Sequence, residues 1–301
     1  IKAALNQKIM REFVREQKIK YFFDINTGVC HQVLPEAGLV WPGMVLIMTD
    51  SHTTTHGAFG AFGTGVGATD LAVALLTGEL WFRVPEIIRI DIDGHLPPGV
   101  MAKDVILHII GTLKQDAAIY KAIEFTGSTV RELSIDGRMV LCNMSVEMGA
   151  KTCYIQPDDK TLAYLKPRVK RPFKVYTTDP GYKYAEEFSF EVEKLEPQVA
   201  VPHTVDNVVS VSEVEGVEVD QVFIGSCTGG RLEDIEIAAR ILKGKKINKN
   251  TRLIVGPASK NVLLEAINAG YIDILLKAGA TIIPPGCGPC LGAHQGVLAP
   301  E

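Results

Sequence analysis

The chain has 301 residues, of which 47% are hydrophobic and 22% charged, so it carries enough apolar side chain for sizeable cores and a disordered protein is excluded. Lysine and arginine number 31 against 35 acidic residues, and the net charge of −4 leaves no large positive field to hold nucleic acid. No window reaches the roughly 18 uninterrupted apolar residues that a membrane-spanning helix needs. We therefore expect neither a nucleic-acid partner nor a membrane partner.

The cysteines are few for this length and unevenly spaced. Such usage favours a reducing, cytoplasmic location and a metal or catalytic role over a disulfide framework. The chain also begins without methionine inside a helix-like run, so we expect it to be part of a longer protein. The six cysteines are Cys30, Cys142, Cys153, Cys227, Cys287 and Cys290.

Hydrophobic periodicity predicts alternating helices and strands through the first half of the chain. Apolar residues at helical spacing predict a helix over residues 1–18, and the apolar run 44–48 predicts a buried strand. A glycine-rich loop, 57–67, follows this strand. The other predicted elements are strands at 21–23 and 87–92 and helices at 31–36, 69–80 and 102–114, with a further helix that starts within 143–148.

The second half divides into an irregular segment and a regular one. Residues 166–197 mix four prolines with charged and aromatic residues, which predicts a connection over the surface. The last third alternates strands with helices, and this order predicts a parallel sheet covered by helices. Its predicted strands are 221–224, 252–255 and 281–284, and its predicted helices are 232–242, 260–269 and 272–278.

These elements predict an α/β protein with mainly parallel sheets in a three-part architecture. The first domain spans residues 1–85, and the second spans 86–200 and includes the surface connection 166–197. The third domain, residues 201–301, carries Cys227, Cys287 and Cys290. We place the breaks near 85 and 200 because a new strand follows Pro85 and the proline-containing connection ends near Pro197.

A glycine motif at residues 63–68 (GTGVGA) fits the loose form of a dinucleotide-binding fingerprint. That fingerprint must follow a strand directly, so that the helix N-terminus meets the pyrophosphate. The nearest predicted strand ends at Thr49, well before the motif. We therefore interpret these glycines as a loop that allows close backbone packing.

Cys227 lies at the centre of a Gly-Ser-Cys-Thr-Gly sequence between a predicted strand and helix. This is the pattern of a nucleophile elbow, and Asp273 and His294 follow in hydrolase order. A helix N-terminus lowers a thiol pKa, and the thiolate can act as a nucleophile or bind a metal. A cysteine hydrolase, a metal site and an inert buried cysteine therefore all stay open for this residue.

Cys287 and Cys290 form a Cys-x-x-Cys pair at the end of the last predicted strand, a spacing typical of redox, zinc and iron–sulfur sites alike. Because both this pair and Cys227 follow parallel strands, the three thiolates are predicted at one edge of the sheet, where α/β folds bind ligands. A cubane cluster held by three cysteines keeps one iron open as a Lewis acid. A zinc site completed by His294 is the alternative.

Five motifs resemble those of the aconitase superfamily, most closely the large subunits of isopropylmalate dehydratase and homoaconitase. They occur in the family order and span nearly the whole chain. The matching stretches are 28–32 (GVCHQ), 49–53 (TDSHT), 142–150 (CNMSVEMGA), 224–228 (IGSCT) and 285–292 (PGCGPCLG).

The resemblance implies a [4Fe–4S] cluster on Cys227, Cys287 and Cys290, with one open iron that takes the substrate hydroxyl and a carboxylate. It also implies a hydro-lyase that isomerises a 2-hydroxy di- or tricarboxylate by dehydration and rehydration. The expected substrate is 3-isopropylmalate, an intermediate of leucine biosynthesis. The alternative is homocitrate, the substrate of homoaconitase in lysine synthesis or 2-oxo acid elongation.

The resemblance assigns catalytic roles to His31, Asp50, His52 and Glu147 around the departing hydroxyl, and polar substrate contacts to Ser51 and Asn143. A histidine–carboxylate pair can protonate a departing hydroxide, which gives these residue types a chemical reason. Without the resemblance, each of them also fits a capping turn, a core histidine or a local polar pair.

The match departs from the family at Gly229, where the family has asparagine. The family's early His-Asp motif, its substrate-binding arginines and the general-base serine of its swivelling domain are not in this sequence. We therefore expect a separate small subunit to carry the swivelling domain and complete the enzyme. A cysteine hydrolase using Cys227 would leave Cys287 and Cys290 without a purpose, and the negative net charge argues against an RNA-binding regulator.

Overall fold

The computed structural model describes residues 2–292 and 295–299, and its largest sheet has four parallel strands in the order β5-β4-β3-β6. Alternate residues of the long strand β3, Ile88, Ile90 and Ile92, are fully buried and join the main core with apolar residues of α4 and α6. The elements are β3 (Ile87–Asp93), β4 (Ala122–Thr126), β5 (Thr152–Tyr154), β6 (Glu186–Glu191), α4 (Ala102–Leu113) and α6 (Ile135–Met144).

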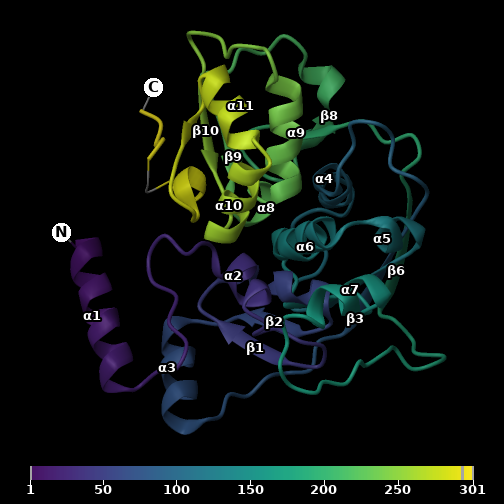
Figure 1. Ribbon diagram of the computed structural model, residues 1–301. Helices are drawn as coiled ribbons and strands as arrows, with labels where there is room; N and C mark the ends of the chain where they lie inside the picture. Colours follow the sequence, from purple (N-terminus) through teal and green to yellow (C-terminus); the bar gives the residue numbers. More distant parts are fainter. Residues whose placement is uncertain (1, 293–294, 300–301) are drawn as a thin grey trace.

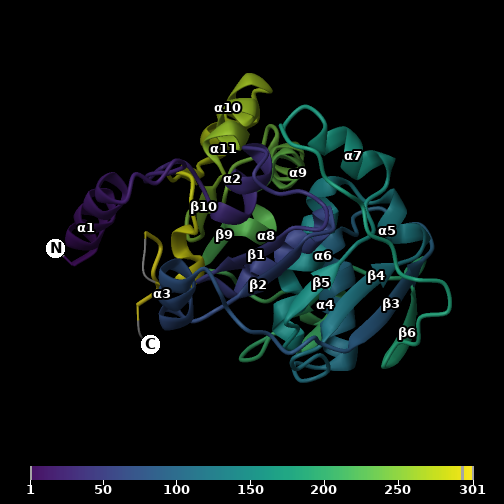
Figure 2. The same cartoon turned by 90° about the horizontal axis from the view of Figure 1, so that it is seen from below.

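The N-terminal elements surround a pair of parallel strands. β1 (Val45–Met48) and β2 (Phe62–Gly65) pair in parallel, and the buried 3₁₀ helix η1 (Ser51–Phe59) connects them. Helix α2 (Cys30–Glu36) packs on η1, whereas α1 (Lys2–Glu16) buries no residue and stands apart from the body in both views (Figures 1 and 2). Helix α3 (Ala68–Thr77) follows β2.

The C-terminal elements form the predicted parallel sheet, which lies at the top of Figure 1. Strand β10 (Arg252–Gly256) pairs on one side with β9 (Gln221–Gly225) and on the other with β11 (Thr281–Ile282). Because all three are parallel, the turns after β9 and β11 emerge at the same edge of the sheet. The helices of this part are α8 (Ser226–Gly229), α9 (Leu232–Leu242), α10 (Lys260–Asn268), α11 (Tyr271–Ala278) and η4 (Gly288–Leu291).

Two hydrophobic cores organise the chain. The smaller core lies among β10, α9, α10 and α11, and the larger one extends from Val40 to Val208. Phe59 and Ala61 share the larger core with β3, so buried contacts cross residue 85, although the sheets divide there. The three-part division into 1–85, 86–200 and 201–301 stays a proposal. The remaining elements are α5 (Ser128–Glu132), η2 (Ser145–Met148), α7 (Asp159–Leu165), β7 (Gln198–Ala200), β8 (Val208–Ser210) and η3 (Val211–Val214).

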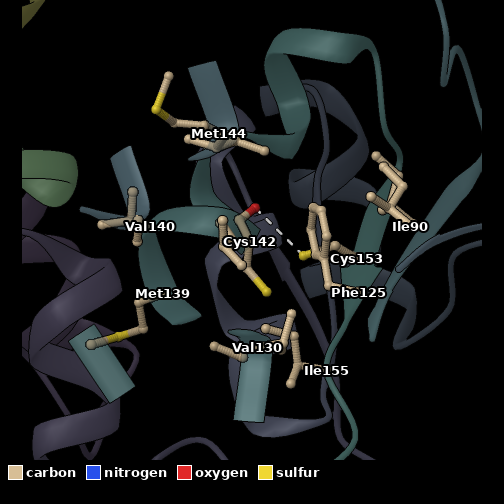
Figure 3. Close-up of a cluster of buried hydrophobic side chains, with 14 of the residues drawn as sticks. Ile90, Phe125, Val130, Met139, Val140, Cys142, Met144, Cys153 and Ile155 are labelled. Carbon is tan, nitrogen blue, oxygen red and sulfur yellow. Dashed lines mark hydrogen bonds between the residues drawn. The ribbon is translucent and has the colours of Figure 1, made fainter. Parts of the chain in front are cut away.

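Figure 3 shows part of the larger core, where two of the cysteines lie. Cys142 and Cys153 are fully buried among apolar side chains, and the Cys153 Sγ donates to the Cys142 carbonyl oxygen at 3.4 Å. Their thiols serve as small core side chains.

Among residues 2–292 and 295–299, no helix combines the length and the apolar character needed to cross a membrane.

Four sequence predictions differ from the structure. Residues 21–23 have no partner strand and stay extended between α1 and α2. The glycine-rich segment contains β2. The connection 166–197 contains the edge strand β6, and the many charged residues of this strand obscure its apolar–polar alternation in the sequence. Within 143–148 the structure has the short 3₁₀ helix η2 rather than the start of an α-helix: α6 begins earlier, where the Ser134 Oγ accepts from the Gly137 backbone N–H, and it ends at Met144.

Candidate active site

His31 and Asp50 meet where the first turn of α2 faces the end of β1. The Asp50 Oδ1 accepts the backbone N–H of His52 at 2.9 Å and so caps η1. The same Oδ1 lies 3.0 Å from the Nε2 of His31, whose side chain is only 1% exposed. Hydrogen bonds from His31 and then His52 hold the pKa of Asp50 well below its ordinary value of 3.8. Asp50 is therefore a carboxylate that fixes the orientation of the His31 ring.

His52 lies between two carboxylates. Its Nε2 is 3.3 Å from Glu147 Oε1, and its Nδ1 is 3.7 Å from Asp50 Oδ1 and 3.2 Å from Ser51 Oγ. Asp50 and then Glu147 raise the pKa of His52 to about 10, against the opposing effect of burial. His52 in turn lowers the pKa of Glu147. At neutral pH the site therefore holds an imidazolium flanked by two carboxylates.

These contacts join His31, Asp50, His52 and Glu147 into one row, which we call the acid–base row. The row unites α2, the start of η1 and η2, and η2 is separated from η1 by almost one hundred residues. Sequence analysis selected all four residues from motifs that lie far apart in the chain, and the structure brings them together.

Ser51 and Asn143 have different surroundings. Ser51 is exposed beside His52, where a bound molecule can reach its hydroxyl. Asn143 is fully buried, and its Nδ2 donates to Thr55 Oγ1 at 2.7 Å, so this amide group supports η1. It makes no local pair with Glu147, because α6 ends at Met144 between them. A substrate contact of Asn143 stays a prediction.

Cys227, Cys287 and Cys290 follow the two outer strands of the C-terminal sheet. Cys227 lies in α8 directly after β9, and the preceding Ser226 has a left-handed backbone with φ +65°. Cys287 and Cys290 flank Gly288, whose φ of +56° suits glycine. Burial, followed by the charge of Cys227, raises the pKa of Cys287 to about 11, and Asp50 and Cys290 act in the same direction. These thiols thus lie within electrostatic reach of one another and of the acid–base row.

Sequence analysis missed four other groups around the row, among them Lys103 in the first turn of α4. Burial lowers the pKa of Lys103, while the charges of Asp234 and then Cys227, Cys290 and Glu147 act in the opposite direction, so the charge of its ammonium group is felt by residues of the site. A lysine in the first helical turn opposes the helix dipole, and this was the one signal in the sequence.

His56, Cys30 and Arg231 gave no such signal. His56 is fully buried with its ring centroid 5.6 Å from that of His31, and burial lowers its pKa to about 3, so it stays neutral. Burial also raises the pKa of Cys30 to about 12. Arg231, in the turn between α8 and α9, is fully buried, and its Nε donates to Gln32 Oε1 at 3.1 Å. Gln32 is the residue after His31, so Arg231 connects the Cys227 turn to α2.

The described residues give no support to the hydrolase interpretation of Cys227. The Asp273 carboxylate forms an ion pair with Lys277 at 2.7 Å on an exposed face of α11 and does not orient a catalytic imidazole. His294, the expected third member of the hydrolase set and the fourth zinc ligand, lies outside the described residues.

Comparisons with known proteins identify a matching family and several similar chains. Residues 2–215 and 212–301 match the model of the Aconitase family (aconitate hydratase). The chain is 55% identical over 299 residues to the 3-isopropylmalate dehydratase large subunit 1 of Methanopyrus kandleri, covering 99% of this chain and 72% of that protein. It is 56% identical over 296 residues to the probable methanogen homoaconitase large subunit of Methanosarcina mazei, covering 98% and 75%.

The fold is similar to that of aconitase X from Thermococcus kodakaraensis, with a TM-score of 0.54 and 16% identity. The match covers 94% of this chain and 67% of that one. At this identity the likeness concerns the fold alone, and it agrees with the predicted α/β architecture.

Proposed function

Because the chain belongs to the aconitase family, we propose that it is the large subunit of an iron–sulfur hydro-lyase that isomerises 3-isopropylmalate by dehydration and rehydration. The observation that carries this proposal is the acid–base row, which lies within electrostatic reach of the three thiols that follow β9 and β11. A dehydratase needs an acid for the departing hydroxide, and His52 is a protonated acid held beside two carboxylates.

Cys227, Cys287 and Cys290 would hold the [4Fe–4S] cluster. Three sulfur donors suit iron, and strands on either side of β10 carry them to one edge of the sheet. When bound, the cluster supplies a Lewis acid at the iron that has no cysteine ligand. The buried thiol of Cys227 and the partly buried thiol of Cys287 would release their protons to solvent as they bind the metal.

The chain's own residues would supply the proton that the departing hydroxide takes up to leave as water. His52 donates it from its imidazolium, and Asp50 and Glu147 stabilise the charged form until transfer. His31, fixed by Asp50, would take part in returning water. The Lys103 ammonium would attract a substrate carboxylate, and the exposed Ser51 hydroxyl would bind a polar group of the substrate.

A separate small subunit would supply the base that removes the proton from the neighbouring carbon. The named relatives are large subunits, which supports a two-subunit enzyme. In the family, the serine that acts as this base lies in a swivelling domain, which we propose belongs to the partner here.

The test is to load the chain with its cluster under anaerobic conditions and assay isopropylmalate and homocitrate, with and without the small subunit. We expect visible cluster absorption that disappears in Cys227→Ser, and turnover of isopropylmalate only in the assembled complex. The identity to a homoaconitase large subunit makes homocitrate the second substrate to assay. Full turnover by the large subunit alone would disprove the two-subunit proposal, and inactivity of the loaded complex on both substrates would disprove the substrate class.

A further inference from the structure

Cys30, His31 and Asp50 bring a sulfur, a nitrogen and an oxygen together at the edge of the acid–base row. Among residues 2–292 and 295–299, this is the one set of three such side chains whose ligand atoms all lie within 4.8 Å of one another. The Cys30 Sγ is 3.8 Å from His31 Nε2, and that nitrogen is 3.0 Å from Asp50 Oδ1. None of the three cysteines proposed for the cluster belongs to this set.

The spacing fits a tetrahedral zinc ion. From ordinary Zn–S, Zn–N and Zn–O bond lengths, the ligand atoms of such a site are separated by about 3.4–3.6 Å. The observed separations of 3.8 and 3.0 Å lie on either side of this range, and because the Cys30 Sγ is equally 3.8 Å from His31 Nδ1, the thiol would turn towards Nε2 to share an ion with it. A mixed sulfur, nitrogen and oxygen donor set is one that zinc accepts readily, whereas magnesium and calcium prefer oxygen alone.

The site is also open to a cation from solution. The His31 ring is buried and held in place, whereas the Asp50 side chain is 41% exposed and Cys30 is partly exposed. Three protein ligands leave the fourth zinc position for water on the exposed side. Cys30 carries no assigned role in catalysis, and among the described residues its thiol hydrogen-bonds with no side chain other than that of His31.

We propose that Cys30, His31 and Asp50 form an inhibitory site for zinc or another thiophilic divalent cation. A cation there would occupy the His31 nitrogen and the Asp50 oxygen that orient the acid–base row, and it would neutralise the carboxylate that stabilises the His52 imidazolium. Zinc binding itself is independent of the proposed function, whereas the inhibition rests on it.

The binding test uses the cluster-loaded chain, dialysed anaerobically against micromolar zinc, with zinc and iron counted by mass spectrometry. We expect one zinc per chain with no loss of iron. Cys30→Ala and Asp50→Asn should each weaken zinc binding by roughly tenfold or more, because each removes a ligand. Cys142→Ala is the matched control, since its sulfur lies in the core, and it should bind zinc as the unmodified chain does.

The inhibition test compares zinc sensitivity, expressed as the ratio of rates with and without zinc, in the assembled enzyme. We expect Cys30→Ala to need at least about tenfold more zinc for half inhibition. No bound zinc, or zinc binding unchanged in Cys30→Ala, would overturn the proposal. Zinc gained only as iron is lost would also overturn it, because the cation would then occupy the cluster cysteines. Normal zinc binding in an inactive complex would instead count against the proposed function alone.

Discussion

Replacing Glu147 with glutamine should lower the pKa of His52. The change keeps the shape of the side chain and removes the negative charge that lies 3.3 Å from His52 Nε2. Asp50 remains in place, so the pKa should fall only part of the way from about 10 towards the ordinary 6.5.

The size of the shift follows from the contact. A hydrogen bond to a charged group contributes roughly 1.5–3 kcal/mol, and one pKa unit corresponds to about 1.4 kcal/mol, which gives about one to two units. The His52 and Glu147 side chains are 32% and 35% exposed, so solvent screening favours the lower end. We expect a decrease of about one unit.

The assay is a pH titration of ¹³C-labelled histidines by NMR in the cluster-free chain, with the His52 signal assigned from His52→Gln. The control is Glu132→Gln, which removes the partner of the exposed His95 at 2.9 Å and should shift only the His95 signal. In the assembled enzyme, the loss of rate at alkaline pH should move to lower pH in Glu147→Gln, because the acid loses its proton earlier. A His52 signal that titrates near 6.5 in the unmodified chain, or does not move in Glu147→Gln, would refute the reasoning.

Three further predictions concern residues that stabilise the fold around the site. Arg138→Met should lower the free energy of unfolding by about 3–5 kcal/mol, because it removes the ion pair to Asp158 and the side-chain donors to the Val130 and Arg131 carbonyl oxygens. Arg240→Met on the surface should change the same free energy by under about 1 kcal/mol, and urea denaturation measures both. Gly63→Ala would place a Cβ 2.3 Å from a backbone carbonyl oxygen of η1, and we expect it to lower the free energy of unfolding by about 1–3 kcal/mol. In Gly229→Ala the new Cβ meets nothing within 4 Å, so the melting temperature should stay unchanged. Gln32→Leu removes the acceptor of the buried Arg231 Nε, so we expect a loss of about 1–3 kcal/mol in the same denaturation assay.

The C-terminal third was predicted well because its elements follow local rules. Each strand there is a short apolar run, and each helix between them shows helical periodicity, so the order alone indicates a parallel sheet. The earlier part of the chain depends more on tertiary contacts. β2 is rich in glycine and forms because its backbone can approach η1 closely, which no propensity reveals. β6 is charged on its exposed side and becomes a strand by pairing with β3.

The same distinction applies to the site. His31, Asp50, His52 and Glu147 could be selected because they lie in motifs that resemble those of the aconitase family, and their residue types also suit acid–base chemistry. Cys30, His56, Lys103 and Arg231 could not, because what distinguishes them is burial and proximity to residues far away in the chain. A single sequence does not contain that information for an isolated cysteine, histidine, lysine or arginine.

Helix α2 determines how the acid–base row lies relative to the cysteines. The chain on either side of Gly28 is bonded to the C-terminal part, through Val29 N to Ala258 O at 2.8 Å and Lys260 N to Thr27 O at 2.9 Å. At the other end of α2, Glu36 accepts from Ser259 Oγ at 2.7 Å and from Asn261 Nδ2 at 2.9 Å. His31 lies between these two attachments, on a helix only seven residues long. The position of its ring is therefore set from two sides, by the part of the chain that carries Cys227 and, through Asp50, by the start of η1.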